Sequence, residues 1–131
     1  MTEPQYLFVY GTLRQDSSRP MSRVLRRHGR RIGRATFPGR LYRVSWYPGA
    51  TDARSGHERV VGDLYVLARP AICLEALDAY EGPEFTRVQR RVQWGRRTRM
   101  AWIYLYTPAV TELRRIPGGE FTGGRRAPHT R

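Results

Sequence analysis

One carboxylate in the sequence lies where a negative charge is costly. Residues from Pro70 onward predict a helix, and the spacing of Leu74, Leu77 and Glu81 places all three on its apolar face. Glu81 is also in the last turn, where the helix dipole disfavours a negative charge. Desolvation and the dipole should both raise its pKa toward neutrality, which suits a general base. A glutamate whose methylenes cover the core while its carboxylate pairs with an arginine is the alternative.

A glycine turn that follows an apolar run is the second candidate element. Residues 6–10 are all aromatic or branched, and they are followed directly by Gly11 and Thr12. A run without a polar side predicts a strand covered on both faces, although a buried helix would have the same pattern. Gly11 permits close approach of a ligand, Thr12 supplies a hydroxyl, and consecutive N–H groups of such a turn can bind an anion. An ordinary strand end has the same residues, so the turn alone does not establish a binding loop.

Length and composition favour one globular domain. The chain has 131 residues, of which 40% are hydrophobic, and its apolar run near the start is too short to span a bilayer. A single cysteine excludes an internal disulfide framework and fits a cytoplasmic setting. The three histidines, His28, His57 and His129, share no ligand spacing with Cys73, so we expect no metal site.

The net charge of +13 comes from 24 basic residues, all of them arginine. A GC-rich coding sequence, typical of some bacteria, would produce this bias because lysine codons are AT-rich. Arginines beside aromatic residues such as Trp46 and Tyr47 also fit a nucleic-acid-binding module. That alternative makes no use of Glu81, whose charge would repel phosphate. We therefore expect only weak, non-specific binding to nucleic acid that collapses between low and physiological salt.

The remaining pattern predicts an α+β fold. Helices are expected at residues 20–28 and 70–81, and strands in the ranges 6–10, 31–37, 40–44, 59–67, 87–94 and 98–106. Most successive strands have no helix between them, which favours a small, strongly curved mixed barrel of about six strands with two flanking helices. Ala50 to Glu58 is expected to be a polar loop, and Gly62 a bulge or a point of close approach. We place a single domain at 1–121 and a disordered tail at 122–131.

Several segments together resemble the γ-glutamylcyclotransferase-like family, which includes γ-glutamylamine cyclotransferases and plant AIG2-like proteins. The similarity runs from about Tyr6 to Thr107. The segments are, in order, Tyr10-Gly11-Thr12-Leu13, Gly39-Arg40-Leu41-Tyr42, Tyr47-Pro48-Gly49, Val61-Gly62-Asp63-Leu64-Tyr65 and Leu77-Asp78-Ala79-Tyr80-Glu81-Gly82. Gly49 departs from the pattern, because many relatives have alanine after the proline.

The resemblance implies a reaction and a site. Glu81 would be the general base and acid, and Tyr10, Gly11, Thr12 and Leu13 would form the substrate-binding loop. A γ-glutamyl compound would cyclise by attack of its own α-amine on the γ-carbonyl, which releases 5-oxoproline and a free amine. The reaction needs no metal, cofactor or protein nucleophile. Because it is intramolecular, the enzyme mainly selects a cyclising conformer.

The identity of the substrate stays open after this resemblance. The released amine could belong to an amino acid, a polyamine, a protein-derived γ-glutamyl-lysine or a biosynthetic intermediate. A member that keeps the fold without the activity is a further alternative. The oligomeric state has no signature in the sequence.

Overall fold

The computed structural model describes residues 3–11, 13, 20–53 and 56–122. Both helices have the predicted bounds. The elements follow the order β1 (Gln5–Val9), α1 (Pro20–His28), β2 (Gly29–Phe37), β3 (Gly39–Arg43), β4 (Pro48–Asp52), β5 (Val60–Leu67), α2 (Pro70–Glu81), β6 (Phe85–Trp94), β7 (Arg97–Tyr106) and β8 (Arg114–Arg115).

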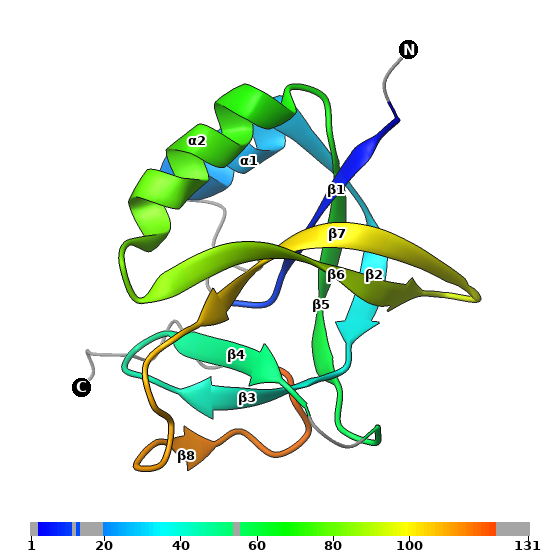
Figure 1. Ribbon diagram of the computed structural model, residues 1–131. Coiled ribbons are helices and arrows are strands. Elements are labelled where there is room, and N and C mark those ends of the chain that lie inside the picture. The colour runs from blue at the N-terminus through cyan, green and yellow to red at the C-terminus, as the bar shows by residue number, and fades with distance from the viewer. Residues whose placement is uncertain (1–2, 12, 14–19, 54–55, 123–131) are drawn as a thin grey trace.

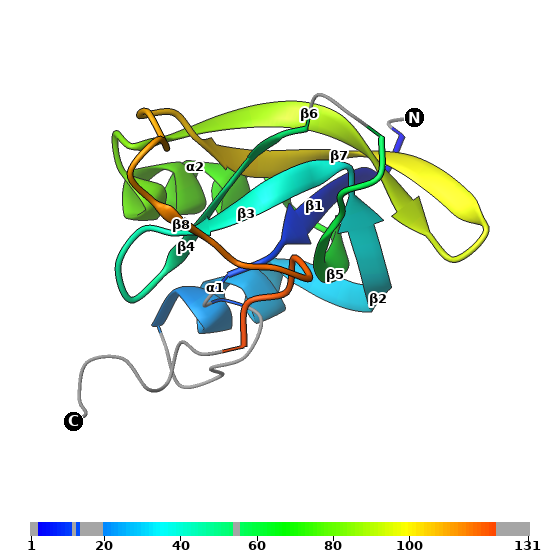
Figure 2. The same cartoon turned by 90° about the horizontal axis from the view of Figure 1, so that it is seen from below.

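The strands close into a ring. Antiparallel pairs join β1 to β5, β5 to β2, β2 to β6 and β6 to β7, and β7 returns to β1 as a parallel pair. This five-strand barrel, with its extra strands and two helices, confirms the predicted α+β class and the curved mixed sheet. Strands β4, β3 and β8 extend from β7 as an arm, which lies at the end of the barrel away from the helices (Figure 1 and Figure 2).

The apolar run of β1 has no polar side because it separates two cores. Phe8 and Tyr10 pack into the cluster that fills the barrel, whereas Leu7 and Val9 face the second cluster. That second cluster contains Leu25 of α1 together with residues of α2, so it joins the helices to the barrel. The prediction of a strand covered on both faces is confirmed.

The expected loop from Ala50 to Glu58 is wrong at its start. Ala50 is 0% exposed within β4, where it pairs with Leu105 of β7. Strand β4 has no alternating pattern of apolar and polar side chains, because small residues are needed where it packs closely against β7. A Cβ on Gly49 would lie 2.8 Å from the Cβ of Tyr106, so alanine would not fit without a shift. Residues 54 and 55 of the expected loop lie outside the described residues.

Strand β8 was not predicted, and it begins the segment that covers the open end of the barrel core. After β8, the N–H of Ile116 donates to the carbonyl of Leu41 at 2.8 Å, and the N–H of Val61 donates to the carbonyl of Gly119 at 2.8 Å. Phe121 then enters the barrel core and is 1% exposed. Of the expected tail, only Thr122 belongs to the described residues, so both the tail and the domain limit at 121 stay predictions.

Candidate active site

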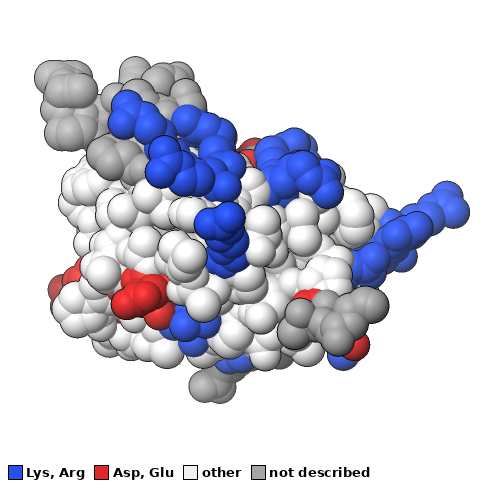
Figure 3. Space-filling model, turned by 90° about the horizontal axis from the view of Figure 1, so that it is seen from above, with Lys and Arg blue, Asp and Glu red and all other residues white. Residues whose placement is uncertain are grey.

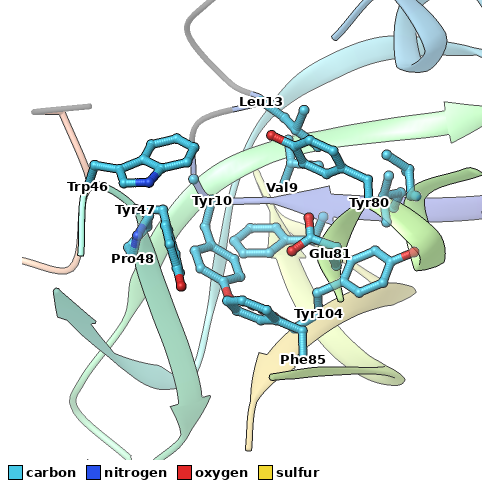
Figure 4. A pocket seen from close by; sticks show the side chains of 14 residues that line it. Val9, Tyr10, Leu13, Trp46, Tyr47, Pro48, Tyr80, Glu81, Phe85 and Tyr104 are labelled. Atoms are coloured by element: carbon cyan, nitrogen blue, oxygen red, sulfur yellow. Dashed lines mark hydrogen bonds between the residues drawn. The ribbon is translucent and has the colours of Figure 1, made fainter. Parts of the chain in front are cut away.

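A pocket of about 260 Å³ opens between the end of β1, the last turn of α2 and the turn that connects β3 to β4 (Figure 4). Helix α2 contributes Leu77, Tyr80 and Glu81. The β3–β4 turn contributes Trp46 and Tyr47 on the facing side of the view in Figure 4. The volume is close to the lower end of the 300–1,000 Å³ that is typical of ligand sites, about the size for a small molecule.

Glu81 is the last residue of α2, and its carboxylate opens into this pocket. Burial raises the pKa of Glu81 to about 7 from an ordinary value of 4.5, because the charged form loses hydration. Burial is the cause, whereas the sequence also suggested a contribution from the helix dipole. In the part of the chain that the structure describes, no side chain forms an ion pair with Glu81, so the arginine-paired alternative has no counterpart there.

Gly82 ends the helix and thereby fixes the direction of Glu81. Its φ is +82°, a backbone conformation that side-chain-bearing residues rarely adopt, and its N–H donates to the carbonyl of Asp78 at 3.4 Å. The chain can therefore leave α2 immediately after the carboxylate and enter β6.

Tyr10 lines the pocket with its ring, but its hydroxyl serves the fold. The hydroxyl donates to the carbonyl of Tyr104 at 2.6 Å and accepts the N–H of Ala50 at 3.0 Å. It thus joins the end of β1 to β7 and β4, and burial raises the pKa of Tyr10 well above its usual range. The sequence placed Tyr10 in the substrate loop. The structure places it at the pocket with its hydroxyl already bonded.

The predicted loop also brings Gly11 and Leu13 to the pocket. Leu13 is buried in the cluster between barrel and helices. Thr12, the third predicted member, lies outside the described residues. A Cβ on Gly11 would lie 3.3 Å from the ring of Pro48, another lining residue, so the absence of a side chain lets these two walls of the pocket approach each other closely.

Replacing Gly11 by valine should raise KM on the order of tenfold while lowering the melting temperature only slightly. The added side chain would displace Pro48 and narrow the pocket, and small displacements of binding groups have large effects on reactivity. Gly56→Val is the matched control, because a Cβ there meets no atom within 4 Å. A large loss of stability with an unchanged KM would identify Gly11 as a simple strand end.

Asp78 anchors the turn that carries Glu81, a role that sequence reasoning missed. It accepts the hydroxyl of Tyr104 at 2.6 Å and a bidentate pair from Arg87 at 2.7 and 3.0 Å. The Arg87 guanidinium lies 4.3 Å from the centre of the Trp102 ring. These contacts fasten α2 to β6 and β7. The signal in the sequence was the position of Asp78 one helical turn before Glu81, on the same side of the helix.

An aromatic wall faces Glu81 across the pocket (Figure 4). The Tyr47 hydroxyl donates to Glu84 Oε1 at 2.8 Å, and the Tyr47 ring lies 6.2 Å from Phe85 and 5.2 Å from Trp46, centre to centre. The sequence suggested Trp46 and Tyr47 as nucleic-acid-stacking residues, and Tyr47 also belongs to one of the segments that resemble the family. Here they line the pocket instead, and the roles of Glu84 and Phe85 were not predicted.

The described ranges contain no candidate metal site. No group of three or more His, Cys, Asp or Glu residues is placed there to hold a metal ion. No helix in the same ranges is long and apolar enough to cross a membrane. What the pocket does contain is one carboxylate with a pKa near neutrality beside a glycine turn, an arrangement that suits proton transfer on a small molecule.

Comparison with known proteins identifies the family to which this barrel belongs. The family model described as "Gamma-glutamyl cyclotransferase, AIG2-like" matches residues 7–123. The chain belongs to this family. No curated protein matches it in sequence.

Solved structures share the fold. YkqA from Bacillus subtilis has a TM-score of 0.72 at 21% identity, over 91% of this chain and 40% of that one. The protein ytfP from Escherichia coli has a TM-score of 0.64 at 28% identity, over 89% and 96%. An AIG2-like protein from Mus musculus has a TM-score of 0.70 at 18% identity, over 92% and 90%. The chain thus spans less than half of YkqA but nearly all of the other two.

Proposed function

We propose that this protein is a γ-glutamylcyclotransferase that releases 5-oxoproline and a free amine from a γ-glutamyl compound. The observation that carries the proposal is the buried Glu81 carboxylate, which forms no ion pair with any residue that the structure describes and has a pKa of about 7, in a pocket bounded by the Gly11 turn. Membership of the family supports the same class of reaction.

In the proposed reaction, Glu81 makes two proton transfers, one before and one after a single ring closure. Glu81 takes a proton from the α-ammonium of the substrate, and the freed amine attacks the γ-carbonyl carbon. The new carbon–nitrogen bond closes the five-membered lactam while the bond to the leaving nitrogen breaks. Glu81 then returns its proton to the leaving nitrogen, and the ring nitrogen gives its second proton to the released amine, which departs as an ammonium, so the base is regenerated without any co-reactant. Proton transfer by a positioned side chain typically contributes about 10²–10⁴-fold.

The wall of the pocket would orient the substrate while Glu81 transfers the proton. Tyr10 and Tyr104 hold each other through the hydrogen bond from the Tyr10 hydroxyl to the Tyr104 carbonyl, which makes the wall beside Glu81 rigid. A rigid wall favours the folded conformer of the substrate that brings the amine to the carbonyl, and such orientation is worth effective molarities of about 10⁵–10⁸ M. The N–H groups at the Gly11 turn would hold the anionic end of the substrate.

The direct test is release of 5-oxoproline from a panel of γ-glutamyl compounds. The panel should include γ-glutamyl amino acids, γ-glutamyl-ε-lysine and γ-glutamyl amides of simple amines. Turnover of any member by the wild-type protein, absent from the same preparation of Glu81→Gln, would support the proposal. Absence of 5-oxoproline from the whole panel would identify a family member without the activity.

The pH dependence gives a second test. Because Glu81 must be ionised to accept a proton, kcat/KM should fall as pH drops below about 7, the pKa of its carboxylate in the folded protein. The exposed Glu75 on the same helix is the control, and Glu75→Gln should leave the profile unchanged. Activity that is flat between pH 5 and 8 would contradict an ionising base with this pKa.

A further inference from the structure

A second pocket, of about 330 Å³, lies on the arm, and none of its described lining residues also lines the site of Glu81. This arm pocket opens between the start of β3, the segment that leads into β5 and the segment that follows β8. All three segments lie at the end of the barrel away from the helices (Figure 1). The volume is within the 300–1,000 Å³ that is typical of small-molecule sites.

The backbone holds the three walls of the arm pocket together. Each wall is joined to the other two by N–H to carbonyl hydrogen bonds, from Gly39 to Glu58 at 3.3 Å, from Ile116 to Leu41 at 2.8 Å and from Val61 to Gly119 at 2.8 Å. Gly119 has a φ of +71°, and a Cβ on it would overlap the carbonyl oxygen of Arg59. Only glycine therefore lets the segment after β8 lie against Arg59. A pocket whose walls are fixed in this way loses little entropy when a ligand binds.

Three arginines surround one carboxylate in the arm pocket. The Nε of Arg40 donates to Glu58 Oε1 at 2.6 Å, and Nη2 of Arg115 donates to the other carboxylate oxygen. Nη1 of Arg59 donates to the carbonyl of Glu58 at 3.0 Å and to that of Gly56 at 2.7 Å. Arg40 and Arg115 hold the pKa of Glu58 below its ordinary value. The Glu58 carboxylate thus marks the point on which these positive charges converge.

The bonds to Glu58 do not exhaust this cluster. Each uses one nitrogen of a guanidinium group, and a guanidinium has further N–H donors; the Tyr42 side chain also contacts Arg40 and Arg115. Both pairs with Glu58 are partly exposed, and such pairs contribute little to stability, so the arginines can turn to a ligand at small cost. With His57 neutral, three positive charges and one negative charge leave the cluster at +2.

Other arginines of the chain are arranged differently. Figure 3 shows one outer face, on which the basic side chains project away from the body of the protein. Arg87 and Arg90 each form an ion pair with one carboxylate, that of Asp78 and of Asp52 respectively. The arm pocket instead gathers an excess of positive charge inside a hollow, so the high arginine content alone does not account for it.

We propose that the arm pocket binds a small molecule that ends in a phosphate monoester, through Arg40, Arg59 and Arg115. This group has a second pKa of about 6, so at neutral pH and above it carries a charge of about −2. Its oxygens match the paired N–H donors of guanidinium groups. A phosphate dianion would neutralise the whole excess charge of the cluster, whereas a carboxylate or a phosphodiester would neutralise half of it. The site is separate from Glu81 and does not depend on the proposed function.

A matched pair of ligands tests the chemistry of the site. Calorimetry at pH 8 and physiological ionic strength compares glycerol 3-phosphate with its methyl diester, which carries one charge fewer. We expect the monoester to bind about tenfold more tightly, because the added charge strengthens hydrogen bonds from the arginines. Equal binding of the two, or no binding of the monoester, would overturn the proposal. Tighter binding of a single-stranded oligonucleotide without a terminal phosphate would also overturn it, in favour of a nucleic-acid ligand.

Two variants with opposite expected effects test the residues. Arg115→Gln should weaken binding of glycerol 3-phosphate about tenfold, whereas Glu58→Gln, which removes the competing charge, should tighten it about threefold or more. Arg90→Gln and Asp52→Asn are the matched controls, because they make the same changes of charge in an exposed pair outside the pocket. Melting curves verify that each variant is folded. Equal effects of the pocket variants and their controls would show a response to net charge alone and would overturn the proposal.

The position of the bound ligand is measured separately, because the Gly11 turn is also a candidate for binding anions. Amide chemical shifts recorded during titration with glycerol 3-phosphate should change at Gly39, Gly118 and Gly119, which line the arm pocket. The amide of Gly11, which lines the site of Glu81, should not change. Shift changes confined to Gly11 and its surroundings would place the phosphate at the site of Glu81 and overturn the proposal.

Discussion

Replacing Glu81 by glutamine should abolish most turnover, with a loss of about 10²–10⁴-fold in kcat/KM. Glutamine keeps the shape of the side chain and its hydrogen-bonding capacity, but it cannot accept the proton of the α-ammonium group. The substrate should still bind, because the aromatic walls and the Gly11 turn are unchanged. Release of 5-oxoproline, measured alongside calorimetric binding, separates the lost proton transfer from lost affinity.

The same substitution should leave the fold as stable as before, or more stable, above pH 7. Burial raises the pKa of Glu81 from 4.5 to about 7, so the folded state binds this proton more tightly than the unfolded chain. The resulting stabilisation is fully present below about pH 4.5 and is lost as pH rises through 7. Above that pH the wild-type protein holds a desolvated charge that glutamine lacks, a difference of at most about 3 kcal/mol.

Melting curves of both proteins from pH 4 to 9 provide the measurement. The difference in melting temperature should grow in favour of Glu81→Gln as pH rises. Glu75→Gln is the control, since it removes an exposed charge from the same helix. If Glu81→Gln melts several degrees lower at pH 8 and still turns over substrate, Glu81 is a structural residue and the assignment is wrong.

The position of Glu81 on the buried face of its helix was predictable because it depends only on neighbouring residues in the sequence. The helix that carries it has the predicted bounds, and three- and four-residue spacing alone places it beside Leu74 and Leu77. The structure confirms that these two leucines are buried. Gly62 is a similar case: a Cβ there would lie 2.3 Å from the carbonyl oxygen of Val9, as the expected close approach requires.

The residues around Glu81 were not predictable because their positions depend on contacts between distant segments. Tyr104 reaches Asp78 only when β7 is paired with β6 beneath α2. Strand β4 has no alternating pattern of its own, and its place is fixed by Ala50 against Leu105 and the Tyr10 hydroxyl. Sequence periodicity reports the side of an element that is buried, but not the side chains it meets there.

Phe121 is the last residue before the predicted tail. Its ring is 1% exposed in the barrel core, although it follows a segment rich in glycine and proline that has no strand or helix pattern. The Arg43 guanidinium lies 5.5 Å from the centre of this ring, and the Gly119 carbonyl two residues earlier accepts the N–H of Val61. The last described residues therefore complete the core rather than only follow it.

Replacing Phe121 by alanine should consequently lower the free energy of unfolding by about 3–5 kcal/mol, the usual cost of removing a buried phenylalanine. In a domain of this size, that corresponds to a fall in melting temperature on the order of 10 °C or more. Phe121→Leu, which keeps most of the apolar volume, should cost much less.

Removal of residues 122–131 should leave both melting temperature and 5-oxoproline release nearly unchanged, because Phe121 remains in place. If that deletion is as costly as Phe121→Ala, the tail contributes to the core or the site, and the domain extends beyond residue 121.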